Sequence, residues 1–219
     1  DFKIAEERIQ GSLAMHTIVQ NDSNDFDIDV GIVFEADNLA NRGAESTRNM
    51  FRNALERKTN TFTDEPEVKT SCVRLKYSEG YHVDFAIFRR HKEYEWDDEF
   101  TYEHAGNKWS IRDIKALEEW FSQKIKEKGI ELRQLVRLSK MFCKSRDTWG
   151  TLPSGLIQTV ICEEVFDYNY DRIDEKFYFT MKNIVNRLSY TLEVRAPIDN
   201  NRLLTTRQID LELMERWKN

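Results

Sequence analysis

Three aspartates in two separate segments have the residue type and spacing that metal-dependent chemistry requires. Asp27 and Asp29 stand two positions apart at the entrance of a strand-like apolar run, 28–34. Because side chains alternate along a β-strand, both carboxylates are expected on one face of that strand. Asp84 lies among apolar neighbours in a second strand-like run, 82–88. If the two strands are adjacent in the sheet, the three carboxylates meet.

Carboxylates gathered in this way repel one another and resist desolvation, so a cation is expected to neutralise them. A ligand set made only of hard carboxylate oxygens favours Mg²⁺ or Mn²⁺ over zinc. Three carboxylates can hold two such ions roughly 3.5–4 Å apart, which stabilises the entering and leaving oxygens of a phosphoryl transfer. The predicted catalytic and metal-binding residues are therefore Asp27, Asp29 and Asp84.

Simpler interpretations of these acids stay open at this point. A D-x-D pair at a strand entrance is often a solvated turn, and a single acid within a strand often faces solvent at a sheet edge. Asp25 shares the strand face of Asp27, so the register of the acidic pair has an alternative. We prefer Asp27 and Asp29 because the unbroken apolar strand begins directly after them.

A Gly-Ser pair precedes the acidic strand. Gly11 allows the backbone to approach a phosphate closely, and Ser12 supplies a hydroxyl and an N–H. An isolated dipeptide of this kind carries no information, but Ser12 stands fifteen residues before Asp27. This position makes it a candidate phosphate-binding turn.

The elements that would position these residues change in character along the chain. Strand-like runs at 27–34, 71–77 and 82–88 surround a helical stretch at 44–55. From residue 109 the period is helical, and Ser110 with Asp113 is typical of a capping box that opens a helix. Further helices are expected at 132–143, 153–166 and 173–188, with a last one marked by Ile209, Leu213 and Trp217.

This pattern predicts an α+β fold, in which a small mixed sheet with flanking helices is followed by a helical subdomain. We expect a catalytic core at 1–105 and a nucleotide-binding helical part at 106–219, packed as one bilobed unit with the active-site cleft between them. The chain starts at Asp1 without a Met and ends on a polar segment. We therefore expect it to be a piece of a longer protein.

Composition narrows the classes of protein further. The 219 residues carry a formal net charge of −6, which argues against a protein that coats itself in nucleic acid. No run of about 18 apolar residues is present, so we expect no membrane-spanning helix. Three widely separated cysteines without a C-x-x-C pair predict reduced thiols and a cytoplasmic location.

Two features of the helical half concern anions. Arg133, Arg137, Lys140 and Lys144 lie on one stripe of a helix, which taken alone indicates a solvated basic face. Ser154 stands in the first turn of a helix begun by Pro153, where unpaired N–H groups and the helix dipole favour anions.

Taken together, these residues resemble the DNA polymerase β-like nucleotidyltransferase superfamily. The closest resemblance is to bacterial CD-NTases, the relatives of cyclic GMP-AMP synthase and oligoadenylate synthetase. The motifs that carry it are Gly11-Ser12, the run Asp27-Ile28-Asp29-Val30-Gly31-Ile32-Val33-Phe34, and Val83-Asp84-Phe85. The resemblance extends through 135–140, 152–156 and 196–201, and so covers nearly the whole chain.

The resemblance implies a function and a set of roles. Gly11 and Ser12 would hold a triphosphate, Asp27, Asp29 and Asp84 would bind two Mg²⁺ (or Mn²⁺), and Lys140 and Ser154 would bind nucleotide phosphates. The reaction would join NTPs, ATP among them, into cyclic or linear oligonucleotide messengers with release of pyrophosphate. The resemblance also implies a role in anti-phage signalling, in which effector proteins bind the product and not the enzyme.

Other outcomes remain open. The nucleotide could go to an RNA, a protein or a small-molecule acceptor, or the fold could be a degenerate binding module without activity. Animal relatives carry a base-stacking aromatic where this chain has Gly155, so stacking would come from elsewhere, with Tyr168, Tyr170 and Tyr190 as candidates. Neither a zinc ribbon nor a dense basic platform is present, which argues against a nucleic-acid activator.

Overall fold

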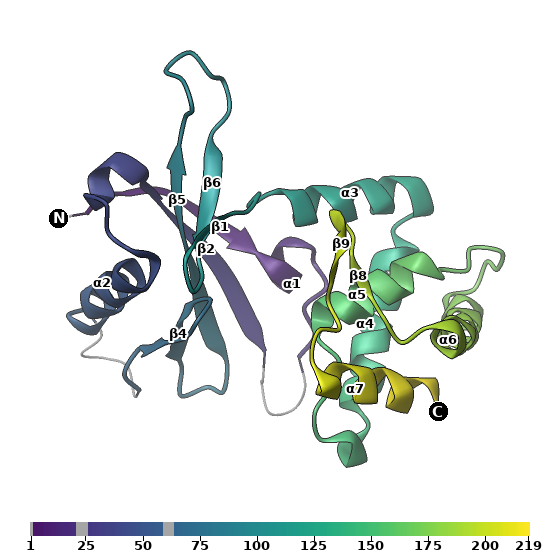
Figure 1. Cartoon of the computed structure of the whole chain (residues 1–219). Helices are drawn as coiled ribbons and strands as arrows, with labels where there is room; N and C mark the ends of the chain where they lie inside the picture. Colours follow the sequence, from purple (N-terminus) through teal and green to yellow (C-terminus); the bar gives the residue numbers. More distant parts are fainter. Residues whose placement is uncertain (1, 21–25, 59–63) are drawn as a thin grey trace. The chain divides into compact units, whose positions relative to one another are not determined.

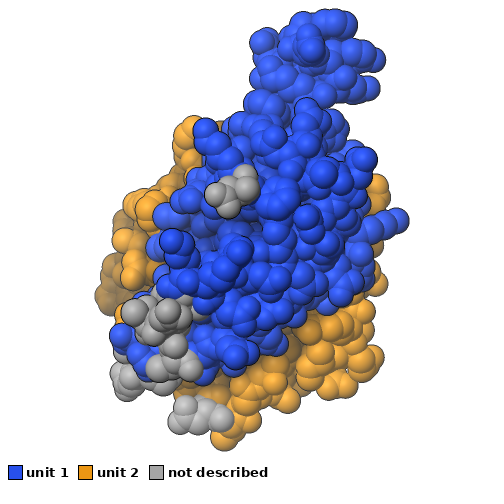
Figure 2. Space-filling view, turned by 90° about the vertical axis from the view of Figure 1, so that its left-hand side faces the viewer, with its two compact units in different colours: residues 1–14, 22–115 blue, residues 15–21, 116–219 orange. Residues whose placement is uncertain are grey.

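Two compact units make up the chain, and the computed structural model describes residues 2–20, 26–58 and 64–219 (Figure 1). Unit 1 contains residues 1–14 and 22–115, and unit 2 contains residues 15–21 and 116–219 (Figure 2). The boundary between them falls after the expected division at 105/106, because the segment that follows residue 105 completes the sheet of unit 1. Segment 15–21, directly after the Gly-Ser turn, belongs to unit 2.

Unit 1 is built on a seven-stranded mixed sheet in the order β1-β2-β5-β4-β3, with β6 paired to β5 and β7 paired to β6. Its strands are β1 (Ile4–Gln10), β2 (Asp27–Glu35), β3 (Glu67–Val68), β4 (Val73–Lys76), β5 (His82–His91), β6 (Thr101–Ala105) and β7 (Trp109–Ile111). Its helices are α1 (Gly11–Ala14), the 3-10 turn η1 (Ala36–Leu39) and α2 (Ala44–Glu56). Strands β2 and β5 run parallel, whereas the other pairs are antiparallel.

Alternation along β2 assigns its two faces to different neighbours. Ile32 and Phe34 pack with Phe51 of α2 in one buried cluster, and Val33 packs with Phe88 and Ile114 in another. Asp27 and Asp29 have the same parity as Val33, so they lie on the sheet face opposite α2.

Unit 2 is helical, as the residue pattern predicts, and confirms the α+β class. Its elements are α3 (Ala116–Lys128), α4 (Glu131–Lys144), η2 (Asp147–Trp149), α5 (Gly155–Glu164), α6 (Ile173–Tyr190), the hairpin β8 (Arg195–Ala196) and β9 (Asp199–Leu203), and α7 (Gln208–Lys218). One apolar core joins them, with Leu135, Ile161, Leu188 and Met214 almost fully buried. Met15 packs into the same core, which fixes the segment that follows the Gly-Ser turn to this unit.

The predicted capping box at Ser110 and Asp113 is wrong. Ser110 lies in β7 and pairs with His104 of β6, while the helix begins only at Ala116. The Asp113 carboxylate accepts a hydrogen bond from the Lys115 backbone N–H at 2.7 Å, which forms a turn before the helix. The S-x-x-D spacing is therefore met by two short local structures rather than by one helix start.

The cysteines are consistent with the expectation of reduced thiols, since all three are buried and free. In the described ranges, none of the helices has both the length and the apolar composition needed to cross a membrane.

Candidate active site

Strands β2 and β5 bring the three predicted aspartates together on one face of the sheet. The parallel register pairs Asp29 with Asp84 and Asp27 with His82. Directly paired residues of adjacent strands point to the same side of the sheet, so all four side chains share the face that lies opposite α2. The alternative acid Asp25 lies outside the described residues.

Asp29 is at the centre of this carboxylate cluster, defined as Asp27, Asp29 and Asp84. Burial raises the pKa of Asp29, and the negative charges of Asp84 and Asp27 raise it further, while His82 and Arg74 act in the opposite direction. An acid whose pKa is raised by like charges lies where a cation binds favourably.

Gly11 packs directly against Asp29. Its φ angle is +61°, a left-handed conformation that glycine adopts at little cost, and a Cβ built on it would lie 1.9 Å from Oδ2 of Asp29. The sequence alone indicates a phosphate-binding role for this glycine. The structure adds a second requirement, because no other residue leaves room for the Asp29 carboxylate. Ser12 follows in the short helical turn α1.

Asp84 is held by a neighbour on the other side of β5. Arg74 of β4, its partner in the strand register, donates through Nε to Oδ1 at 2.7 Å and through Nη2 to Oδ2 at 2.6 Å. Burial would raise the pKa of Asp84, but the hydrogen bonds and charge of Arg74 outweigh it and the pKa is lowered. The Cys72 thiol also hydrogen-bonds this carboxylate.

Asp27 lies against His82, a residue to which the sequence pattern assigns no chemical role. Nε2 of His82 is 2.5 Å from Oδ1 of Asp27. Neither His82 nor Arg74 stands in a motif, and both come from the register of β2, β5 and β4. The alternation of His82 and Asp84 along β5 was the one sequence signal that could have indicated His82.

The donor chemistry of the cluster fits a hard divalent cation. Three carboxylates on one face offer oxygen ligands of the kind that Mg²⁺ and Mn²⁺ prefer. Among the residues that the structure describes, no three His, Cys, Asp or Glu side chains already form a cage for a metal. Oxygens of Asp84 and Asp27 face Arg74 and His82, so these carboxylates would have to turn or share their oxygens to hold an ion.

Lys140 in unit 2 does not lie on a solvated face. The residue is 6% exposed, and its Nζ donates to the carbonyl oxygen and to Oγ1 of Thr17 at 3.1 and 3.0 Å. A Cβ on Gly155 would lie 3.4 Å from both Cε and Nζ of Lys140. This is an ordinary van der Waals distance, so Gly155 packs beside the Lys140 side chain.

Ser154 caps α5, since its Oγ accepts a hydrogen bond from the Ile157 backbone N–H at 3.3 Å. The stacking candidates differ in exposure: Tyr190 and Tyr168 are largely exposed, whereas Tyr170 stacks on Phe179 with ring centroids 4.0 Å apart.

A known protein family matches the part of the chain that contains the carboxylate cluster. Residues 5–88, which contain the Gly-Ser turn and all three aspartates, match the family described as cyclic GMP-AMP synthase DncV-like, nucleotidyltransferase domain. Over these residues the chain is similar to nucleotidyltransferase domains of that family.

Other comparisons extend the likeness across nearly the whole chain. A cyclic GMP-AMP synthase of Escherichia albertii is 29% identical over 212 residues, which cover 91% of this chain and 46% of that protein. The DncV cyclic AMP-GMP synthase of Vibrio cholerae superposes with a TM-score of 0.75 at 18% identity, covering 97% of this chain and 61% of its own. The Bradyrhizobium diazoefficiens CD-NTase CdnG, solved with GTP, gives 0.69 at 15% identity, with 98% and 75% covered.

The chain spans about half the length of this curated relative. The two solved structures share the fold with this chain at low identity.

Proposed function

We propose that this chain is the catalytic part of a nucleotidyltransferase that joins NTPs into cyclic or linear oligonucleotides with release of pyrophosphate. One observation carries the proposal: Asp29 and Asp84 are paired across two parallel strands, with Asp27 on the same face. The nucleotidyltransferase family match over residues 5–88 and the likeness to a cyclic GMP-AMP synthase support the reaction class. In the proposed division of labour, 1–105 is the catalytic core and 106–219 contributes nucleotide binding.

Metal dependence is part of this proposal, with Asp27, Asp29 and Asp84 as ligands of Mg²⁺ or Mn²⁺. Such ions, when bound, neutralise the triphosphate and lower the pKa of the attacking ribose hydroxyl. The carboxylates orient the reacting groups, and Asp84 is the proposed acceptor of the hydroxyl proton. Arg74 lowers the pKa of Asp84, so this carboxylate accepts a proton poorly as long as the pair is intact.

Phosphate binding is assigned to two sets of residues. In unit 1, Gly11 and Ser12 follow β1, and Gly11 lies against Asp29. In unit 2, Lys140 lies beside Gly155 at the start of α5, where Ser154 caps the helix. Helix N-termini attract phosphate through their backbone N–H groups and dipole, which supports this second set.

We propose ATP as one substrate, a cytoplasmic location and a role in anti-phage signalling.

The test is incubation of the purified protein with all four NTPs and Mg²⁺, followed by mass spectrometry of the products. Cyclic or linear oligonucleotides, formed with pyrophosphate and lost in Asp84→Ala, are the expected result. If product forms only when an RNA, a protein or a small molecule is added, then that molecule, and not a second NTP, accepts the nucleotide. Failure of the folded protein to release pyrophosphate under any of these conditions would contradict it.

A further inference from the structure

Asp84 is the one carboxylate of the cluster whose two oxygens are both bound to the same cation of the protein. Arg74 donates to Oδ1 at 2.7 Å and to Oδ2 at 2.6 Å. The Arg74 side chain is 21% exposed and the Asp84 side chain 15%. A bidentate guanidinium–carboxylate pair of this kind has fixed geometry and is stronger than a neutral hydrogen-bond pair. Arg74 therefore holds Asp84 in one orientation.

The charge of Arg74 acts on the whole carboxylate cluster. It lowers the pKa of Asp84 and also works against the upward shift of the Asp29 pKa. In return, the Asp84 hydrogen bonds and charge raise the pKa of Arg74, and Asp27 contributes in the same direction. Arg74 thus partly neutralises three acids that would otherwise repel one another.

A divalent ion bound at Asp84 would need the same carboxylate oxygens that accept hydrogen bonds from Arg74. An ionised carboxylate offers about four lone-pair sites on its two oxygens, and Arg74 takes one site on each. An ion approaching Asp84 either displaces an N–H donor or binds beside a positive guanidinium, which repels it. Both routes weaken the binding of an ion that uses Asp84.

We propose that Arg74 is the built-in counter-ion of Asp84, a positioning residue that competes with the metal and so sets the affinity of the cluster for divalent ions. The inference rests on the proposed function, since it requires that Asp84 be a metal ligand. It assigns Arg74 a role that is opposite to that of an ordinary structural ion pair: removal of Arg74 strengthens metal binding.

Unit 1 provides a matched control for this role. Arg89 of β5 pairs with Glu103 of β6 at 2.6 Å, with side chains 25% and 15% exposed, so its distance and burial resemble those of the Arg74 pair. The Arg89 pair lies at the other end of β5, five positions along the strand from Asp84. Loss of Arg89 removes an equal charge from the same sheet without freeing a cluster oxygen.

The experiment is titration of Mn²⁺ alone into the folded protein, with free Mn²⁺ followed by electron paramagnetic resonance. Variants are Arg74→Gln, Arg74→Lys, Arg89→Gln and Asp29→Asn, each checked for its thermal unfolding transition. We expect Arg74→Gln to bind Mn²⁺ at least about tenfold more tightly than the unchanged protein, because a charge-assisted pair no longer competes. Arg74→Lys, which keeps the charge but loses the fork, should fall between the two.

The outcomes separate this inference from the proposed function. Mn²⁺ binding that Asp29→Asn removes but Arg74→Gln leaves unchanged or weakens overturns the counter-ion role alone. Equal tightening in Arg89→Gln and Arg74→Gln also overturns it, because the effect would then follow net charge. No cluster-dependent binding in any of the proteins overturns the proposed function and this inference together. If Arg74→Gln does not fold, Arg74→Lys decides by the direction of its change.

Discussion

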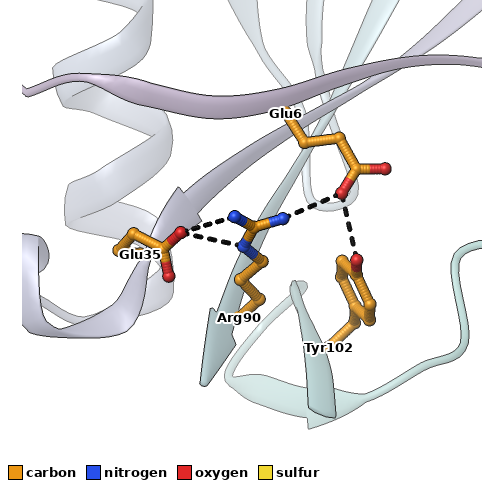
Figure 3. A network of polar contacts seen from close by, with 4 residues as sticks. All are labelled: Glu6, Glu35, Arg90 and Tyr102. Carbon is orange, nitrogen blue, oxygen red and sulfur yellow. Dashed lines mark hydrogen bonds and ion pairs between the residues drawn. The ribbon is translucent and has the colours of Figure 1, made fainter. Parts of the chain in front are cut away.

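The two ends of the β2–β5 strand pair differ in the charges that they bring together: one end pairs two acids, and the other pairs an acid with a base. At one end, Asp29 and Asp84 are direct partners, with Asp27 beside them. At the other end, Glu35 is paired with Arg90, whose guanidinium donates to Glu35 at 2.9 and 2.7 Å and to Glu6 at 3.2 Å (Figure 3).

The far end is a balanced network. The Tyr102 hydroxyl donates to Glu6 at 3.0 Å, and Arg90 also lies over the Phe100 ring at 4.1 Å from its centroid. Each of the two glutamates thus has a donor, and the network links β1, β2, β5 and β6. The cluster end instead gathers like charges, which raises the Asp29 pKa. One end therefore stabilises the sheet, whereas the other retains electrostatic repulsion that a bound cation would relieve.

Loss of an acid from the carboxylate cluster should have the largest effect on activity. Asp29→Asn keeps the shape of the side chain but removes a ligand and the repulsion with Asp84 and Asp27, so we expect activity to fall at least about 1,000-fold with stability unchanged or increased. Pyrophosphate release and thermal unfolding measure the two effects. Near-normal release by the folded variant would show that Asp29 has no part in the reaction.

Gly11→Ala should have the next largest effect, because it acts on the same carboxylate. A left-handed alanine costs about 1–2 kcal/mol, and its Cβ would displace Asp29 Oδ2. We expect lower stability and a loss of activity of about 100-fold or more. Gly43→Ala is the control, since its φ is −66° and nothing lies within 4 Å of its added Cβ. Equal behaviour of the two variants would refute the packing argument.

Arg90→Met should damage the balanced end without affecting chemistry. It leaves Glu35 and Glu6 without their guanidinium partner, and we expect a loss of about 2 kcal/mol in the free energy of unfolding, discounted for partial exposure. Urea unfolding measures this loss, and activity per folded molecule should stay within about twofold. Arg52→Met, which breaks a single half-exposed helical pair with Glu56, should cost only about 0.5 kcal/mol.

The smallest expected effect is a pH dependence from His104 in the same sheet. Burial lowers the pKa of His104, whose Nε2 donates to the Ser71 carbonyl oxygen at 2.9 Å. As the pH falls, His104 takes up a proton near pH 6.5 in the unfolded chain but only at a lower pH in the folded one. The stability that comes from burying the neutral His104 ring is therefore present above about pH 6.5 and is lost as the pH falls below it. Melting temperatures at pH 7.5 and 5.5 should therefore differ less in His104→Gln. An unchanged difference would contradict the assignment.

Much of this arrangement could be predicted from residue patterns. The apolar runs of β2 and β5 and the helical periods of α2, α4, α6 and α7 are long enough to identify the elements. Alternation predicts that Asp27 and Asp29 share a face, and the parallel pairing places Asp84 on that face too. Other strands are harder to predict: β1 is rich in charged residues, and β7, β8 and β9 have three, two and five residues.

Contacts that depend on register or on distant segments could not be predicted. Arg74 meets Asp84 only because the turn between β4 and β5 sets their pairing, and no motif encodes it. Lys140 is buried by Thr17, which is 123 residues away in the sequence, so its helical stripe alone indicates a solvated face. The roles assigned to Lys140 and Ser154 stay predictions.

In the proposed reaction, the three aspartates of β2 and β5 hold divalent ions for nucleotidyl transfer. The most direct measurement is anomalous scattering from a crystal of the protein grown with Mn²⁺ and a non-hydrolysable ATP analogue. We expect anomalous peaks at about 2–2.3 Å from carboxylate oxygens of Asp27 and Asp29, with at least one also within reach of Asp84. A nucleotide bound with Mn²⁺ elsewhere, and none at these carboxylates, would contradict the claim.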